Sequence, residues 1–290
     1  MIGQFPIQIG VLIIVALVYA VFDVFNKRNV PDILVYATVV IGLIIALVYN
    51  YNTIYLDLLI AVIIALVGFV IYKMGFLGGG DVLELVFVSL VLPVQSMAPY
   101  YTSSPQLNIP FVLSVIIAAG YTALIFMPIY YILVKRIFAG MKLQKPEKKS
   151  VMMAVTLLIA YLAFAYIFTY AYGVKLVSVA LVVVLAVSSF VTILFEKDIY
   201  NGMTKMLYPS QLELGDMLAL NLMKESEIKF FKGKYRGFGR LATTEALKAL
   251  KGVKRKLPVY RDSVPFSLFI LFGVLISLAF GNIVLVLIGI

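Results

Sequence analysis

The chain of 290 residues has no cysteine and no histidine. The absence of cysteine excludes disulfides, thiolate nucleophiles, iron–sulfur clusters and cysteine-ligated zinc. The absence of histidine removes the most common general base and the most common metal ligand. Any proton chemistry must therefore use carboxylates, lysine or tyrosine, and we expect neither a metal ion nor another cofactor.

Charged residues are also scarce, at 13%, whereas hydrophobic residues make up 63% of the chain. Ordinary soluble domains contain about 25% charged and roughly 45–50% apolar residues. This composition indicates a membrane protein. The apolar runs are continuous and do not alternate with polar residues, which favours membrane-spanning helices over the strands of a barrel.

Eight apolar runs are read as spanning helices, although a glycine-rich start and Pro93 make the fourth irregular. The runs are residues 5–25, 32–50, 53–73, 80–98, 110–134, 151–173, 175–195 and 265–289. We expect the first run to be retained, because it is of full spanning length and has no small-residue cleavage site after it. The predicted fold class is therefore an all-α polytopic membrane protein with about eight transmembrane helices.

The basic residues predict how these helices are oriented. Of the 24 lysines and arginines, all except Lys175 fall in expected loops that would lie on one side of the membrane. The positive-inside rule makes this side cytoplasmic and leaves both termini outside. The net charge of +10 then reflects topology; a basic face can also attract anionic membrane lipids, and no motif supports nucleic-acid binding. We expect a multi-pass protein of the cytoplasmic membrane.

Five regions follow from this pattern. They are a membrane core at 1–136, a basic cytoplasmic loop at 137–150, a transmembrane hairpin at 151–196, a small soluble cytoplasmic α+β insertion at 197–263 and a last transmembrane helix at 264–290. Within the insertion, the sequence predicts a turn and strand at 211–221, a helix at 243–252 capped by Thr243 or Thr244, and a strand at 256–260.

Acidic residues inside apolar runs are costly and raise a functional question. Asp57 lies near the outer end of the third run, where its side chain can reach water. Asp23 lies near the inner end of the first run and Asp81 at the inner start of the fourth, so both are expected at a similar depth near the cytoplasmic face. Two carboxylates in a poorly solvated site share a proton. One can then act as a base on water while the other hydrogen-bonds the carbonyl under attack, as in aspartic proteases.

Gly78, Gly79 and Gly80 directly precede Asp81. Glycine adopts positive φ readily and allows close approach of backbones, so we expect this loop to bring Asp81 against the first helix and to leave space for a substrate. The alternative is a flexible loop that simply leads into a helix. Glu84 shares the helical face of Asp81; it could tune the pair, hold substrate or face a polar crevice.

The segments around these residues resemble sequence motifs of a known protein family. GGGD at 78–81 matches the GxGD motif of membrane-embedded aspartyl proteases. DVFNKRNVPD at 23–32 resembles the first-aspartate segment of the type IV prepilin peptidases, and VPFSLFILFG at 264–273 is similar to archaeal members, including preflagellin peptidases. The resemblance implies that Asp23 and Asp81 are catalytic and that the glycines form the loop beside them.

The resemblance also implies a substrate and a cellular setting. Members of the family cut the short basic leader from type IV prepilin-like or prearchaellin precursors at the cytoplasmic face of the membrane, and the similar members are archaeal. Bacterial members usually carry four zinc-binding cysteines and often methylate the new N-terminus, so without cysteine we expect no methyltransferase activity here. Leu83 stands where many bacterial members have lysine, and eight spans exceed the six of a minimal preflagellin peptidase.

Two other interpretations remain open. A presenilin-like or signal-peptide-peptidase-like protease also uses GxGD, but those families place tyrosine before the first aspartate, where this chain has Phe22, and carry a Pro-Ala-Leu segment that is absent here. Paired membrane carboxylates also mark the ion paths of proton-coupled transporters. Such transporters typically have broken helices in two matching halves, and this sequence contains one glycine-rich break.

Overall fold

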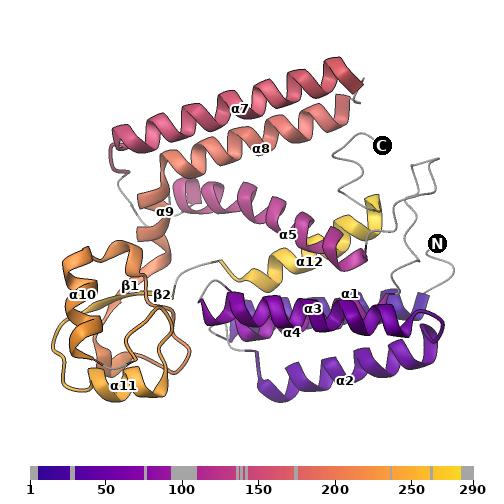
Figure 1. Cartoon of the computed structure of the whole chain (residues 1–290), viewed down its shortest axis with the longest axis horizontal. Coiled ribbons are helices and arrows are strands. Elements are labelled where there is room, and N and C mark those ends of the chain that lie inside the picture. The colour runs from indigo at the N-terminus through magenta and orange to yellow at the C-terminus, as the bar shows by residue number, and fades with distance from the viewer. Residues whose placement is uncertain are drawn as a thin grey trace.

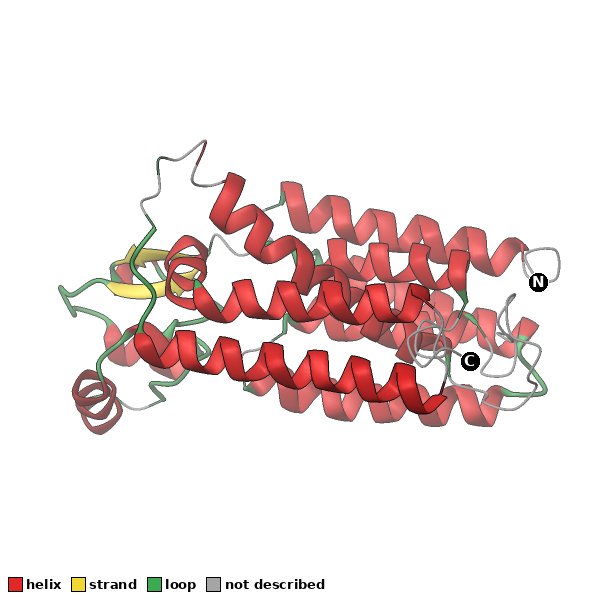
Figure 2. Cartoon of the chain, turned by 90° about the horizontal axis from the view of Figure 1, so that it is seen from above, coloured by secondary structure: helices red, strands yellow, loops and turns green. Residues whose placement is uncertain are grey.

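The structure is a computed structural model of the chain. It describes residues 6–26, 30–74, 77–92, 110–134, 137, 140, 143–172, 176–235, 237–261 and 264–281. Long helices dominate, and the strands of a small sheet lie at one end of them (Figures 1 and 2).

Eight helices coincide with the eight apolar runs. They are α1 (Pro6–Phe25), α2 (Asp32–Tyr49), α3 (Ile54–Lys73), α4 (Gly79–Val91), α5 (Phe111–Pro128) continued by the π-helical η1 (Ile129–Val134), α7 (Lys148–Tyr172), α8 (Leu176–Leu194) and α12 (Phe266–Phe280). The fourth is shorter than predicted, since it ends at Val91, just before Pro93, which cannot supply the N–H that a continuing helix needs. The predicted continuation of the last helix beyond Gly281 lies outside the described residues.

Five of the described helices are long and apolar enough to cross a membrane. A sixth span results if α8 is counted together with α9 (Glu196–Met203), which is bent from it by 74°. The helix α12 is apolar but shorter, and α4 has only 13 residues. A multi-pass membrane protein is therefore supported, whereas the count of eight spans and the outward location of both termini stay predictions.

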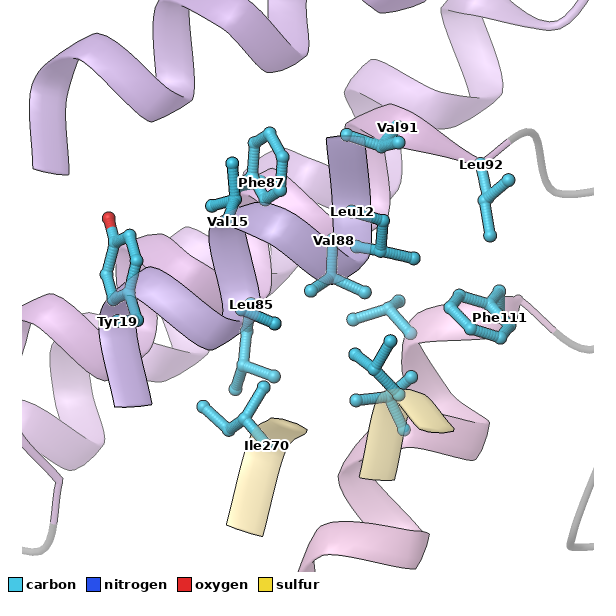
Figure 3. Packing of buried hydrophobic residues seen from close by; sticks show 14 of the residues in the cluster. Leu12, Val15, Tyr19, Leu85, Phe87, Val88, Val91, Leu92, Phe111 and Ile270 are labelled. Carbon is cyan, nitrogen blue, oxygen red and sulfur yellow. The ribbon is translucent and has the colours of Figure 1, made fainter. Parts of the chain in front are cut away.

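The short helix α4 packs against α1, α2 and α3, and its mostly apolar residues from Glu84 to Val91 are buried all round. Its side chains pack with those of α1, α5 and α12, among them Leu12, Phe87, Phe111 and Ile270 (Figure 3). Glycines on the neighbouring helices allow close contact: a Cβ on Gly42 would lie 3.1 Å from Phe87, and one on Gly68 would lie 2.4 Å from Val82. A helix that is hydrophobic all round is typical of a core position.

Amide side chains cap the far end of α4. Gln8 donates from Nε2 to the carbonyl oxygen of Val91 at 2.7 Å, and Asn50 donates from Nδ2 to that of Leu90 at 3.1 Å. These bonds satisfy carbonyls that a helix end leaves without partners. Nearby, Asp57 is fully buried and accepts a hydrogen bond from Thr53 at 3.1 Å. The expectation that Asp57 reaches water is therefore wrong.

The helix α12 joins this core although it is last in the sequence. It packs against α1 and α5, and Gly273 permits the contact because a Cβ there would lie 2.6 Å from the carbonyl oxygen of Val115. The hairpin of α7 and α8 flanks α5 on the outside (Figure 1). Tyr121 of α5 donates its hydroxyl hydrogen to the carbonyl oxygen of Leu181 in α8 at 2.8 Å.

An inserted module, residues 196–261, lies between α8 and α12. Its strands β1 (Thr204–Leu207) and β2 (Leu257–Tyr260) pair antiparallel, and α9, α10 (Glu225–Lys234) and α11 (Thr244–Leu250) complete it. A separate apolar cluster fills its interior, including Leu218, Phe231, Leu250, Leu257 and Val259.

The predictions for this module were partly correct. The helix near 243–252 is confirmed with Thr243 as its N-cap, which accepts from Ala246 N at 3.2 Å, and the strand near 256–260 is confirmed as β2. The strand predicted within 211–221 is wrong, because this segment contributes only isolated bridges of Met217 and Leu218. The partner of β2 is instead β1, which precedes that segment and has no clear alternation of apolar and polar residues.

Candidate active site

Asp23 lies near the end of α1 and Asp81 near the start of α4. The end of α1 and the start of α4 lie at the same end of the helix bundle, so the two residues reach the same depth. Asp23 is 7% exposed. Asp81 is partly exposed. The expectation of matched depth for these two residues agrees with their positions in the structure.

Ser267, the second residue of α12, contacts both carboxylates. Its backbone N–H donates to Oδ2 of Asp23 at 3.2 Å, and its hydroxyl donates to Oδ1 of Asp81 at 3.0 Å. The two carboxyl groups therefore flank a single residue, and their charges interact. Our sequence reasoning missed Ser267. The only signal was a hydroxyl two residues after Pro265, at the start of an otherwise apolar run.

Each carboxylate accepts a hydrogen bond from the N-terminus of a helix, although Asp23 itself lies near the C-terminal end of α1. The N–H of Ser267 is among the first backbone donors of α12, which have no partner within their own helix. Asp81 is the third residue of α4, and its Oδ2 accepts from the backbone N–H of Gly78 at 3.1 Å. The positive ends of two helix dipoles thus face the pair and favour negative charge there.

The three glycines do not have the backbone conformation that was expected. None of Gly78, Gly79 and Gly80 has a positive φ, because Gly79 and Gly80 are already helical and Gly78 is extended at φ −73°. A Cβ on Gly78 would lie 2.9 Å from Oδ2 of Asp81, whereas one on Gly80 would be 3.8 Å from its nearest neighbour, Val30. The expectation of positive φ is wrong. The close approach is that of Gly78 to Asp81 itself.

Glu84 lies one turn deeper in α4 and is fully buried. Its two carboxyl oxygens have no partner at normal hydrogen-bond distance among the described residues, although the hydroxyl of Ser267 lies near enough to interact with the group. Glu84 interacts electrostatically with Asp81, with Asp23 and with the buried Tyr19, whose hydroxyl is hydrogen-bonded to Thr38 at 2.8 Å. The expectation that Glu84 faces a polar crevice stays a prediction, since the residue is fully buried but lies among other polar side chains. An unpaired charge in such surroundings is costly, so we expect Glu84 to carry a proton.

The chemistry available at this site is that of carboxyl groups. Within the part of the chain that the structure describes, no cluster of three or more acidic side chains is arranged to hold a metal ion. Two carboxyls that interact can exchange one proton between them. With a hydroxyl and two backbone N–H groups fixing their oxygens, the pair can activate a water molecule and polarise a carbonyl group.

A comparison with protein families matches residues 10–128 to the Type IV leader peptidase family. No curated protein and no solved structure matches the chain. The matched segment contains Asp23, the three glycines and Asp81, and it ends before Ser267. Residues 10–128, which contribute both aspartates of the site, are therefore similar to the type IV leader peptidase family.

Proposed function

We propose that this protein is a member of the type IV leader peptidase family and acts as a membrane-embedded aspartyl endopeptidase. It removes the short basic leader of type IV pilin-like or archaellin precursors at the cytoplasmic face of the membrane, and Asp23 and Asp81 carry the reaction. The observation that supports this most directly is the meeting of both carboxylates at Ser267.

The proposed chemistry uses the pair as base and acid in turn. The ionised carboxylate takes a proton from water while the water oxygen bonds to the scissile carbonyl carbon. The protonated carboxyl donates its proton to the carbonyl oxygen, which gives a neutral tetrahedral diol. Return of one hydroxyl proton to a carboxylate, with protonation of the amide nitrogen, breaks the C–N bond and releases the leader acid and the new N-terminal amine. No covalent enzyme intermediate forms.

The proposed substrate fits the depth of the pair. A precursor held in the membrane by its apolar helix keeps its basic leader on the cytoplasmic side. The junction of the two then lies near the helix ends that carry Asp23 and Asp81. The scissile bond must be outside the helix, because a carbonyl engaged in a helical hydrogen bond is poorly exposed to attack.

The test is cleavage of a prepilin-like precursor by the purified protein in proteoliposomes. Asp23→Asn and Asp81→Asn should each lower turnover by a factor on the order of 10²–10⁴, the usual contribution of a general acid or base. Glu225→Gln is a matched control, since it makes the same carboxyl-to-amide change at an exposed residue of the inserted module. Turnover by either aspartate variant at the rate of the wild type would refute the proposal.

A second substrate separates this proposal from cleavage within the bilayer. Its junction is moved two helical turns into the apolar segment, and we expect cleavage to fall sharply. Efficient cutting of the moved junction would favour a presenilin-like protease. Proton flux that depends on Asp23, without cleavage of any precursor, would favour a transporter. We expect the released N-terminus to remain unmethylated when S-adenosylmethionine is supplied, which mass spectrometry of the product measures.

A further inference from the structure

Ser267 reaches the aspartates from a part of the chain far outside the matched family segment. It follows Asp23 by 244 residues and Asp81 by 186. It is fully buried, and each of its two donors contacts a different carboxylate. A buried serine with this pair of contacts holds the two carboxyl groups in a fixed relative orientation.

The place of Ser267 in α12 explains why its hydroxyl is available. Buried hydroxyls in helices commonly bond to a carbonyl of the preceding turn of their own helix. Ser89 does so with the carbonyl oxygen of Val86 at 2.7 Å, and Thr122 with that of Ala119 at 2.9 Å. Ser267 is the second residue of its helix, so no preceding turn exists. Its hydroxyl is directed to Asp81 instead.

The helix that carries Ser267 is held firmly against α5. Gly273 allows close contact with the backbone at Val115, and the ring of Phe272 stacks on that of Phe126 in α5 with centroids 5.9 Å apart. At the far end of α12, the hydroxyl of Ser114 in α5 donates to the carbonyl oxygen of Gly281 at 3.2 Å. Residues on packed helices hold reacting groups more precisely than residues on loops.

We propose that Ser267 is a positioning residue of the active site, and that α12 completes a site which the matched segment alone lacks. The inference rests on the proposed function of Asp23 and Asp81. The hydroxyl hydrogen bond favours the ionised form of Asp81 and fixes its rotamer. The backbone N–H orients Asp23. The pair is thereby aligned before substrate binds.

The proposal predicts different effects for two substitutions of Ser267. Ser267→Ala removes the donor to Asp81 and keeps the backbone donor to Asp23. We expect kcat to fall about 10- to 100-fold, as misplacement of a reacting group does, while KM changes by less than about twofold because bound substrate does not need the hydroxyl. The acidic limb of the pH–rate profile should move to higher pH, since a carboxylate that loses a donor holds its proton more tightly. Ser267→Thr, which retains a hydroxyl, should restore most of the rate.

Ser277→Ala is the matched control, because it removes a buried hydroxyl from the same helix away from the carboxylates. It should leave kcat and the pH profile unchanged. Cleavage by the wild type is first shown to depend on both aspartates. If Ser267→Ala then has the same kcat and the same pH profile as the wild type, the proposal is wrong. It is equally wrong if Ser267→Ala and Ser277→Ala lower kcat alike and Ser267→Thr restores nothing, since that pattern reflects packing.

An infrared measurement keeps the inference separate from the proposed function. The C=O band of a protonated carboxyl reports the hydrogen bonds that the group receives, whether or not the protein cleaves anything. We expect the carboxyl bands assigned through Asp23→Asn and Asp81→Asn to shift in Ser267→Ala and to stay unchanged in Ser277→Ala. Identical bands in the wild type and Ser267→Ala would overturn the positioning role even if the cleavage assay succeeded.

Discussion

Replacement of Gly78 by alanine tests the geometry of the site with a single carbon atom. The new Cβ would lie 2.9 Å from Oδ2 of Asp81, whereas ordinary contacts begin near 3.4 Å. The carboxylate must therefore move by about half an ångström, which weakens the hydrogen bond that it accepts from the N–H of Gly78. Alanine causes no backbone strain at this position, because φ −73° and ψ 151° of Gly78 lie in the extended region open to all residues.

The size of the effect follows from this displacement. A misplacement of about 1 Å costs on the order of 10²-fold in rate, and a hydrogen bond to a charged group contributes about 1.5–3 kcal/mol. We therefore expect Gly78→Ala to lower kcat by about 10- to 100-fold, or roughly 1.4–2.7 kcal/mol in activation free energy. The melting temperature in detergent should change little.

Gly80→Ala is the matched control two residues away. Its Cβ would be 3.8 Å from Val30, an ordinary contact, and alanine is about 1 kcal/mol more favourable than glycine within a helix. We expect activity within about twofold of the wild type and equal or greater thermal stability. Initial rates of precursor cleavage in proteoliposomes measure both variants. Full activity of Gly78→Ala, or an equal loss in Gly80→Ala, would refute the role assigned to Gly78.

Two further predictions concern buried and capping residues. Glu84→Met replaces a buried carboxyl group, which has no partner at normal hydrogen-bond distance among the described residues, by an apolar side chain of similar length. We expect the free energy of unfolding in detergent to rise by about 1–3 kcal/mol. A loss of stability would mean that Glu84 has a stabilising partner. Thr243→Ala removes the N-cap of α11 and should lower stability by about 1 kcal/mol while cleavage stays within about twofold of the wild type, as thermal unfolding and initial rates would reveal. A larger effect on rate than on stability would instead link α11 to the active site.

The sequence by itself determined the class of the protein, the positions of its long helices and the two aspartates of the candidate site. These features depend on local sequence or on the depth of a residue across the membrane alone. The length of an apolar run is governed by the thickness of the bilayer, and an acidic residue near the end of such a run has a predictable depth. The end of α1 and the start of α4 share a side because two expected spanning helices, α2 and α3, separate them. Asp23 and Asp81 could therefore be paired without knowledge of the tertiary structure.

Only the tertiary structure decided what surrounds these aspartates. Ser267 meets them because α12 returns to the core after the inserted module, and no local pattern indicates which helices become neighbours across 186 or more residues. The burial of Glu84 and Asp57 likewise depends on packing from several helices. The glycines show the same limit. The sequence indicated a close approach, but the start of α4 decides which glycine makes this approach. Because α4 begins at Gly79, Gly78 is the glycine that lies against the carboxylate of Asp81.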